Sequence, residues 1–200
     1  MAALQTGSGP AAGEHSGAKP SFDQSKAQKV TDKLFIGPIG SVGTVGEDAV
    51  VSCLWEAPPV PAGVTQLHVQ VRDDGQRSLA KHFQGIFDFI STVEGTVLVH
   101  CSSGVSRSAT AVIGTLVLGG QKLSAAYAAT HAARPCILPS DALFKELQEL
   151  EKAKHGNVSM TELDFHAYQL ATVTQKPLAT CKSALATAGG SVERAAAALF

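Results

Sequence analysis

The chain has 200 residues, of which 44% are hydrophobic and 16% are charged, with a formal net charge of −1. This content suffices for one good core and a small second one, and the charge balance excludes a general basic surface for nucleic acid. Four scattered cysteines predict a reducing compartment, and the seven histidines lack metal-ligand spacing, so we expect no metal site. No apolar run approaches the length of a bilayer span, so no membrane partner is predicted.

Residues 1–28 are rich in Ala, Gly, Ser and Pro and lack the apolar stretch of a signal peptide. This composition predicts a disordered tail. Together with the cysteine usage, it predicts a cytoplasmic protein, with the nucleus as the alternative location.

Apolar and polar residues alternate from Thr65 to Val71, a pattern typical of a half-buried strand. This strand leads to Asp73 and Asp74, which we place in a loop. Ser78 is a suitable N-cap for the helix that follows. The apolar face of that helix comprises Leu79, Phe83, Ile86, Phe87 and Ile90.

The most informative segment is His100–Ser108, with the sequence HCSSGVSRS. It follows a short apolar run that predicts a buried strand, and it precedes Ala109–Leu118, which is apolar enough for a buried helix. Cys101 and Arg107 therefore lie on a tight turn between strand and helix. Such a turn directs backbone N–H groups and the positive end of a helix dipole at one point, where a dianion fits.

The residue types in this turn match the needs of phosphate chemistry. The guanidinium of Arg107 can grip two phosphate oxygens, and the helix end and the arginine favour the thiolate of Cys101. The segment therefore predicts a cysteine phosphatase. The alternative is a buried free cysteine at a strand end, the commonest fate of a lone cysteine.

Beyond the turn, Ser140-Asp141 opens a helix that we expect to end near His155–Asn157. Ser159 and Glu162 then form a capping-box pattern for a further helix. Pro177 begins the next, Gly189-Gly190 ends it, and Ser191 caps the last. The predicted domains are a tail at 1–28, a catalytic domain at 29–156 and a helical module at 157–200.

His100–Thr110 resembles the signature loop of the dual-specificity protein phosphatases, within the cysteine-dependent tyrosine phosphatase superfamily. Lys33–Gly37 and Ala49–Leu54 resemble two strands of that family, and Arg134–Pro139 resembles the link between its last two helices. The resemblance covers residues 29–155. It implies an α/β fold with a mostly parallel central sheet flanked by helices, here followed by a small three-helix bundle.

The resemblance assigns roles to the loop. Cys101 is the nucleophile that forms a phosphocysteine, and Arg107 with the loop N–H groups stabilises the phosphate oxygens. Ser108 donates a hydrogen bond to the sulfur, which eases its departure, and His100 orders the loop. The phosphate-binding residues are Ser102, Ser103, Gly104, Val105, Ser106 and Arg107.

A carboxylic acid must protonate the leaving group. In the family, this acid lies six residues before a leucine that starts the following helix, and Leu79 places it at Asp73. Asp74 is the competing candidate, with a solvated turn as its alternative role.

The loop has no basic residue besides Arg107, which favours phosphoproteins carrying phosphotyrosine or phosphoserine and phosphothreonine over inositol lipids or RNA. No cofactor is expected. The competing function is a scaffold that binds phosphoproteins without turnover. Cys53 is either core filler or the partner of an oxidised Cys101 in a protective disulfide.

Residues 158–200 resemble the ubiquitin-associated fold, and more closely its variant at the start of elongation factor Ts. Val173–Pro177 departs from the Met-Gly-Phe-like loop of ubiquitin binders, so we expect weak or absent ubiquitin binding. The module is predicted to bind a protein partner or to stabilise the catalytic domain as a helical cap. We expect it to lie outside the catalytic machinery, so that a chain ending at His155 keeps its rate on a small phosphate ester. The rival outcome is that this chain unfolds, because apolar residues of the module cover the catalytic core.

Overall fold

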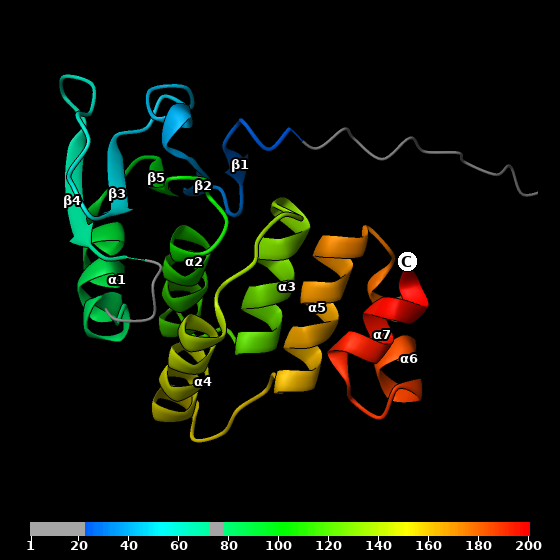
Figure 1. The fold of residues 1–200 in the computed structure, drawn as a ribbon. Helices are drawn as coiled ribbons and strands as arrows, with labels where there is room; N and C mark the ends of the chain where they lie inside the picture. Colours follow the sequence, from blue (N-terminus) through cyan, green and yellow to red (C-terminus); the bar gives the residue numbers. More distant parts are fainter. Residues whose placement is uncertain (1–22, 73–77) are drawn as a thin grey trace, which may run out of the picture.

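A computed structural model describes residues 23–72 and 78–200, which form a five-stranded sheet with helices packed beside it (Figure 1). The order across the sheet is β1-β2-β5-β3-β4, and only β1 runs antiparallel to its neighbour. The strands are β1 (Gln28–Lys29), β2 (Leu34–Pro38), β3 (Ala49–Leu54), β4 (Thr65–Gln70) and β5 (Val97–Cys101). The predicted α/β fold with a mostly parallel sheet is confirmed.

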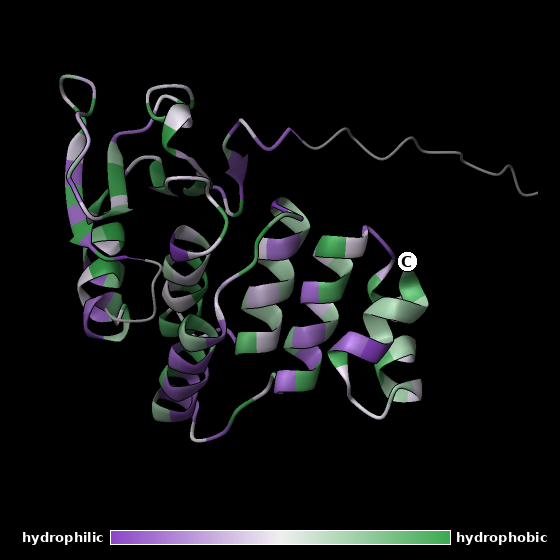
Figure 2. Ribbon diagram, in the orientation of Figure 1, coloured by the Kyte–Doolittle hydropathy of each residue, from purple (hydrophilic) through white to green (hydrophobic). Residues whose placement is uncertain are grey.

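Strand β5 lies in the middle of the sheet between β2 and β3. All of its residues are buried, as expected for a short apolar run in a parallel sheet. Cys101 pairs with Pro38 at the carboxyl end of the neighbouring strand. Strand β4 instead alternates between hydrophilic and hydrophobic residues, as predicted (Figure 2).

Helix α2 packs against the sheet and against α1, α3 and α4, so it is the central helix of the catalytic domain. The helices are α1 (Phe83–Thr92), α2 (Arg107–Leu118), α3 (Leu123–Ala133), α4 (Asp141–His155), α5 (Glu162–Thr174), α6 (Leu178–Thr187) and α7 (Val192–Leu199), with 3-10 turns at Ile39–Ser41 and Ala80–His82. None of the helices in the described ranges is long and apolar enough to cross a membrane.

Two predicted helix ends are confirmed, and one helix begins later than predicted. Helix α4 ends at Gly156, which adopts the left-handed conformation with φ 79°, and Ser191 caps α7 by accepting a hydrogen bond from the Arg194 N–H. After Ser78, the chain forms a 3-10 turn before α1 begins at Phe83. The Ser78 hydroxyl accepts a hydrogen bond from the Ala80 N–H at 3.0 Å.

The capping box of α5 lies two residues beyond the predicted Ser159 and Glu162. Thr161 and Asp164 form it reciprocally, with hydrogen bonds of 3.1 and 3.2 Å. Ser159 has other partners, because its N–H donates to the Glu151 carboxylate at 2.7 Å and its hydroxyl accepts from α3. These contacts with α3 and α4 keep Ser159 in the link.

Helix α5 belongs to two apolar clusters. On one side Met160, before the helix, and Phe165 are 1% exposed and join the core beneath the sheet, where Phe165 stacks on Phe144 with ring centroids 4.0 Å apart. On the other side Leu170 packs against α6 and α7 in a second cluster. Figure 1 shows α5 between α3 and the pair α6 and α7. Of helices α5, α6 and α7, α5 therefore also belongs to the catalytic core. The predicted domain boundary between residues 156 and 157 stays a prediction.

Most of the predicted disordered tail, residues 1–28, lies outside the described residues. Its last part is ordered, which differs from the prediction. The buried guanidinium of Arg134 donates to the backbone carbonyls of Gln24 and Lys26, at 2.9 Å each, and to the side chain of Gln28. This mostly polar segment is thus held in place by one buried cation and, at Gln28, by the pairing of β1 with β2.

Candidate active site

The loop between β5 and α2 is held with its carbonyl oxygens turned away from the pocket. Four consecutive carbonyls accept hydrogen bonds from surrounding elements. The bonds run from Ile39 N to Ser102 O (3.2 Å), Arg134 Nη2 to Ser103 O (2.9 Å), Arg134 Nε to Gly104 O (2.7 Å) and Leu138 N to Val105 O (2.9 Å). Because these carbonyls are engaged on the outside, the inner side of the loop presents N–H groups to the phosphate site.

Gly104 is required by two features of the loop. Its φ is +69°, a conformation that other residues rarely adopt. A Cβ atom at this position would lie 2.5 Å from the carbonyl carbon of Gly37 on the neighbouring strand. The loop can therefore approach β2 this closely only with glycine.

Cys101 is 2% exposed at the bottom of the pocket, and its pKa is lowered. Burial is the largest single influence and raises the pKa. Four other influences lower it and together outweigh burial: the Ser108 hydroxyl 3.3 Å from the sulfur, the N–H groups of Ser108 and Val105, and the charge of Arg107. The loop thus stabilises the thiolate, the form that attacks phosphorus.

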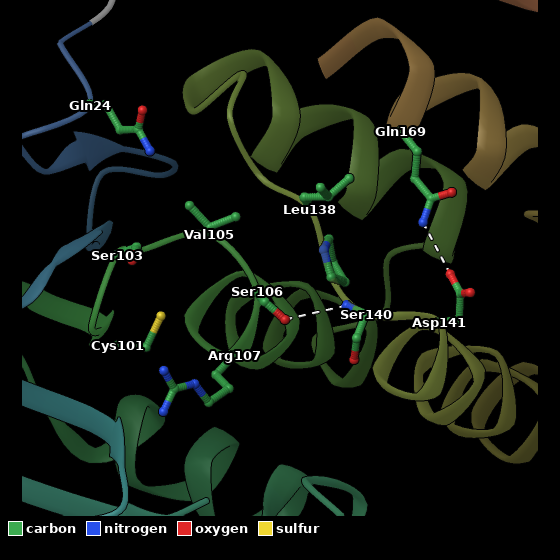
Figure 3. A pocket seen from close by; sticks show the side chains of 11 residues that line it. Gln24, Cys101, Ser103, Val105, Ser106, Arg107, Leu138, Ser140, Asp141 and Gln169 are labelled. Atoms are coloured by element: carbon green, nitrogen blue, oxygen red, sulfur yellow. Dashed lines mark hydrogen bonds between the residues drawn. The ribbon is translucent and has the colours of Figure 1, made fainter. Parts of the chain in front are cut away.

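The guanidinium of Arg107 lies beside Cys101 (Figure 3). It donates to the Ser102 hydroxyl at 3.1 Å and to the Val71 carbonyl at 3.5 Å. Contacts with two separate elements fix the plane of the guanidinium, and a fixed plane is needed for bidentate binding of phosphate oxygens.

His100 is buried beneath the loop and bonds to the neighbouring strand. The Gln66 amide donates to the Ser52 hydroxyl at 2.9 Å, and this hydroxyl lies 2.8 Å from His100 Nε2. Ser52 thus links the imidazole to the Gln66 amide on the next strand. Burial lowers the pKa of His100, which favours the neutral form. The arrangement agrees with an ordering role.

An open pocket of about 640 Å³ surrounds these groups. It is lined by Gln24, Cys101, Ser103, Val105, Ser106, Arg107, Leu138, Pro139, Ser140, Asp141 and Gln169. Figure 3 shows Cys101 and Arg107 at one end of the pocket and Asp141 and Gln169 at the other. A phosphate group fills only the first end, so the second is available for the rest of a substrate.

The structure brings together the predicted loop residues, from His100 to Ser108. The two acid candidates, Asp73 and Asp74, lie outside the described residues. Cys53 is fully buried on β3, and burial raises the pKa of its thiol. Its roles as core filler or as the disulfide partner of an oxidised Cys101 stay predictions.

Two residues of this site have roles that the sequence did not reveal. Arg134 was predicted only as part of a link, yet it supports two loop carbonyls; an Arg-Pro pair after a helix gives no sign of burial. Gln169 was predicted only as part of the helical module, yet it reaches the pocket. No local pattern distinguishes it from other polar residues on α5.

The Ser108 hydroxyl is expected to set the acid limb of the pH–rate profile. Ser108→Ala removes a hydrogen bond that stabilises the thiolate, so the pKa of Cys101 should rise and the acid limb of kcat/KM should move to higher pH. The measurement is hydrolysis of a small aryl phosphate between about pH 4 and 8, the range in which such groups titrate. An unmoved acid limb would show that Ser108 does not tune the thiol.

The thiolate nucleophile, the arginine clamp and the ring of N–H groups at a helix N-terminus define a cysteine-dependent phosphatase site. Comparison with known proteins agrees. The family model for the dual specificity phosphatase catalytic domain matches residues 46–153, more than half of the chain. The chain therefore belongs to the dual specificity phosphatase family.

One relative, a probable dual specificity protein phosphatase of Dictyostelium discoideum, is 31% identical over 145 residues, covering 68% of each chain. The match to another from the same organism covers only 22% of that longer relative. The crystal structure of human DUSP28 is 27% identical with a TM-score of 0.62, covering 68% of this chain and 98% of that one. The human tyrosine phosphatase-like serine/threonine/tyrosine-interacting protein is 26% identical with a TM-score of 0.58, covering 64% and 97%.

Proposed function

We propose that this chain is an active protein phosphatase that hydrolyses phosphotyrosine and phosphoserine or phosphothreonine through a phosphocysteine. The observation that carries the proposal is the position of the Cys101 sulfur, 3.3 Å from the Ser108 hydroxyl and beside the Arg107 guanidinium, an arrangement that lowers the pKa of the thiol. A buried thiol without these partners would have a raised pKa and would not attack.

The proposed reaction has two steps. The Cys101 thiolate attacks phosphorus, the S–P bond forms, and the P–O bond to the leaving group breaks. Water then attacks the phosphocysteine, so that an O–P bond forms and the S–P bond breaks, and a proton of the water passes to the carboxylate that protonated the leaving group. Inorganic phosphate departs, and the thiolate returns. Arg107 and the loop N–H groups stabilise the equatorial oxygens in both steps, and the Ser108 hydroxyl stabilises the departing thiolate.

The leaving group takes a proton from Asp73, which we propose as the general acid. Asp73→Ala should lower kcat about 100-fold or more, the usual scale for loss of a general acid. The matched variant Asp74→Ala should have a much smaller effect. The substrate is an aryl phosphate with a poor leaving group, because a good one hardly needs the proton. A larger loss with Asp74→Ala would shift the assignment by one residue.

The competing proposal is a scaffold that binds phosphoproteins without turnover. One structural neighbour is named a phosphatase-like interacting protein, so the fold itself does not exclude this role. The test incubates the full chain with a phosphotyrosine peptide and a phosphothreonine peptide and measures released phosphate. Release from both supports the proposal. Saturable binding without release would favour the scaffold.

A phosphoprotein substrate in a reducing compartment completes the proposal. The phosphate loop offers serines, glycine and valine around Arg107, with no second cation for a polyanionic substrate. The nucleophile must remain a thiolate, which favours the cytoplasm or nucleus. No cofactor takes part in the steps above.

We further propose that the helices after residue 156 form a module similar to the ubiquitin-associated fold. The three short helices, the caps at Thr161 and Ser191, and the apolar cluster among α5, α6 and α7 support this. The module's contact with the catalytic core favours a stabilising cap. A protein partner on its outer surface remains part of the proposal, with weak or absent ubiquitin binding.

A further inference from the structure

Helix α5 reaches the catalytic pocket through Gln169. The Gln169 amide donates a hydrogen bond of 3.0 Å to Asp141 Oδ1, and both residues line the pocket that contains Cys101 (Figure 3). The matched catalytic domain ends at residue 153, before α5 begins. One wall of the pocket is therefore supplied by a helix outside the matched family domain.

Asp141 supplies a carboxylate at this end of the pocket. Its hydrogen-bond partner is a neutral amide, and no ion pair neutralises it among the residues that the structure describes. It begins α4, whose N-terminal dipole favours a carboxylate there. Among the residues lining the pocket, Arg107 supplies a positive charge at the phosphate end and Asp141 a negative charge at the other end.

The Asp141 carboxylate is also shared with a second pocket of about 380 Å³ between α4 and α5. Cys101 does not line that pocket, whose polar residues besides Asp141 are Glu162, Lys145 and His166. A chain bound with its phosphate at Arg107 can thus extend over Asp141 toward α5. Among the described residues, the first charged group that it meets beyond the phosphate site is the Asp141 carboxylate.

We propose that Asp141, oriented by Gln169, selects phosphopeptides that carry a lysine or arginine near the phosphorylated residue. This inference rests on the proposed phosphatase function. A cation on the peptide is attracted to the carboxylate, while an acidic flanking residue is repelled. Gln169 is a positioning residue, because its amide fixes one carboxylate oxygen and leaves the other available to the substrate.

The test uses one phosphotyrosine peptide in which a single flanking residue is lysine or glutamate, at each of three positions on either side. For the wild-type chain, kcat/KM should favour lysine about fivefold at one or more positions, the scale of a partly exposed ion pair. Asp141→Asn should bring this ratio close to one. Gln169→Ala should give an intermediate ratio. Both values of kcat/KM in each lysine-to-glutamate ratio are measured on the same protein preparation. A variant that is only partly folded therefore lowers both values equally and leaves the ratio unchanged.

The matched control is Asp88→Asn on α1, because Gln84 donates to Asp88 at 2.7 Å in a similar pair that does not line the pocket. It should keep the wild-type ratio. If the wild-type chain hydrolyses all the peptides with no preference for lysine over glutamate, the inference about Asp141 is overturned and the proposed phosphatase function stands. Failure to hydrolyse any of them would instead overturn the proposed function. If Gln169→Ala has the same lysine-to-glutamate ratio as the wild type, Gln169 and therefore α5 have no part in substrate selection.

Discussion

Cys101→Ser should lower kcat for a small aryl phosphate by about 10⁴-fold or more, the scale of losing a nucleophile in covalent catalysis. The loop stabilises a thiolate through hydrogen bonds and the Arg107 charge. A serine hydroxyl has a far higher pKa, and His100 bonds to Ser52 rather than facing the pocket. No neighbouring base in the described part of the site is placed to activate the hydroxyl.

The matched control is Cys136→Ser, which changes a half-buried thiol in the link after α3 and should keep its activity. The Cys101→Ser protein should still bind a phosphopeptide, because Arg107 and the loop N–H groups are unchanged. Equal hydrolysis by wild type and Cys101→Ser would contradict the proposed mechanism.

Phe165→Ala should destabilise the whole chain by about 3–5 kcal/mol, the usual cost of removing a buried phenylalanine. Phe165 is 1% exposed, stacks on Phe144 and contacts Tyr127 edge-on at 6.0 Å. The matched control is Leu163→Ala on the same helix, where the side chain is 47% exposed and the loss should stay within about 0.5 kcal/mol. Urea unfolding of the two variants measures the difference.

The same contacts predict the fate of a chain that ends at His155. Without Met160 and Phe165, the apolar surface of α3 and α4 becomes exposed, and the loss is comparable to the whole stability of a small domain, about 5–15 kcal/mol. We therefore expect the shortened chain to aggregate or unfold. A folded, fully active shortened chain would show that α5 is dispensable.

The sequence was most informative where chemistry and local geometry coincide. The segment from Cys101 to Ser108 contains the nucleophile, the arginine that binds phosphate and the serine that supports the sulfur. One strand, one turn and one helix therefore suffice to bring these side chains together. Strand β3 has the bounds Ala49–Leu54 that the resemblance gave it, and it forms from a buried run in which only Ser52 is polar. The end of α4 at Gly156 follows from a local rule on left-handed glycine.

The sequence was ambiguous where two local patterns compete. Ser159-x-x-Glu162 matches a capping box, and Thr161-x-x-Asp164 forms the actual one. The choice depends on Glu151, which binds the Ser159 N–H from another helix. A pattern within one segment contains no information on such a partner.

By itself, the sequence determined the phosphate loop and the helices that follow, because each depends on neighbours in the chain. The parallel sheet followed from the resemblance to the family, since its strands pair across distant segments. The tertiary structure decided that Arg134 supports the loop from behind, that Phe165 completes the catalytic core and that Gln169 meets Asp141 beside the pocket. The physical reason is that a side chain's burial and partners are set by packing between distant segments. Periodicity gives the face of a helix, and only the packed helices show what that face contacts.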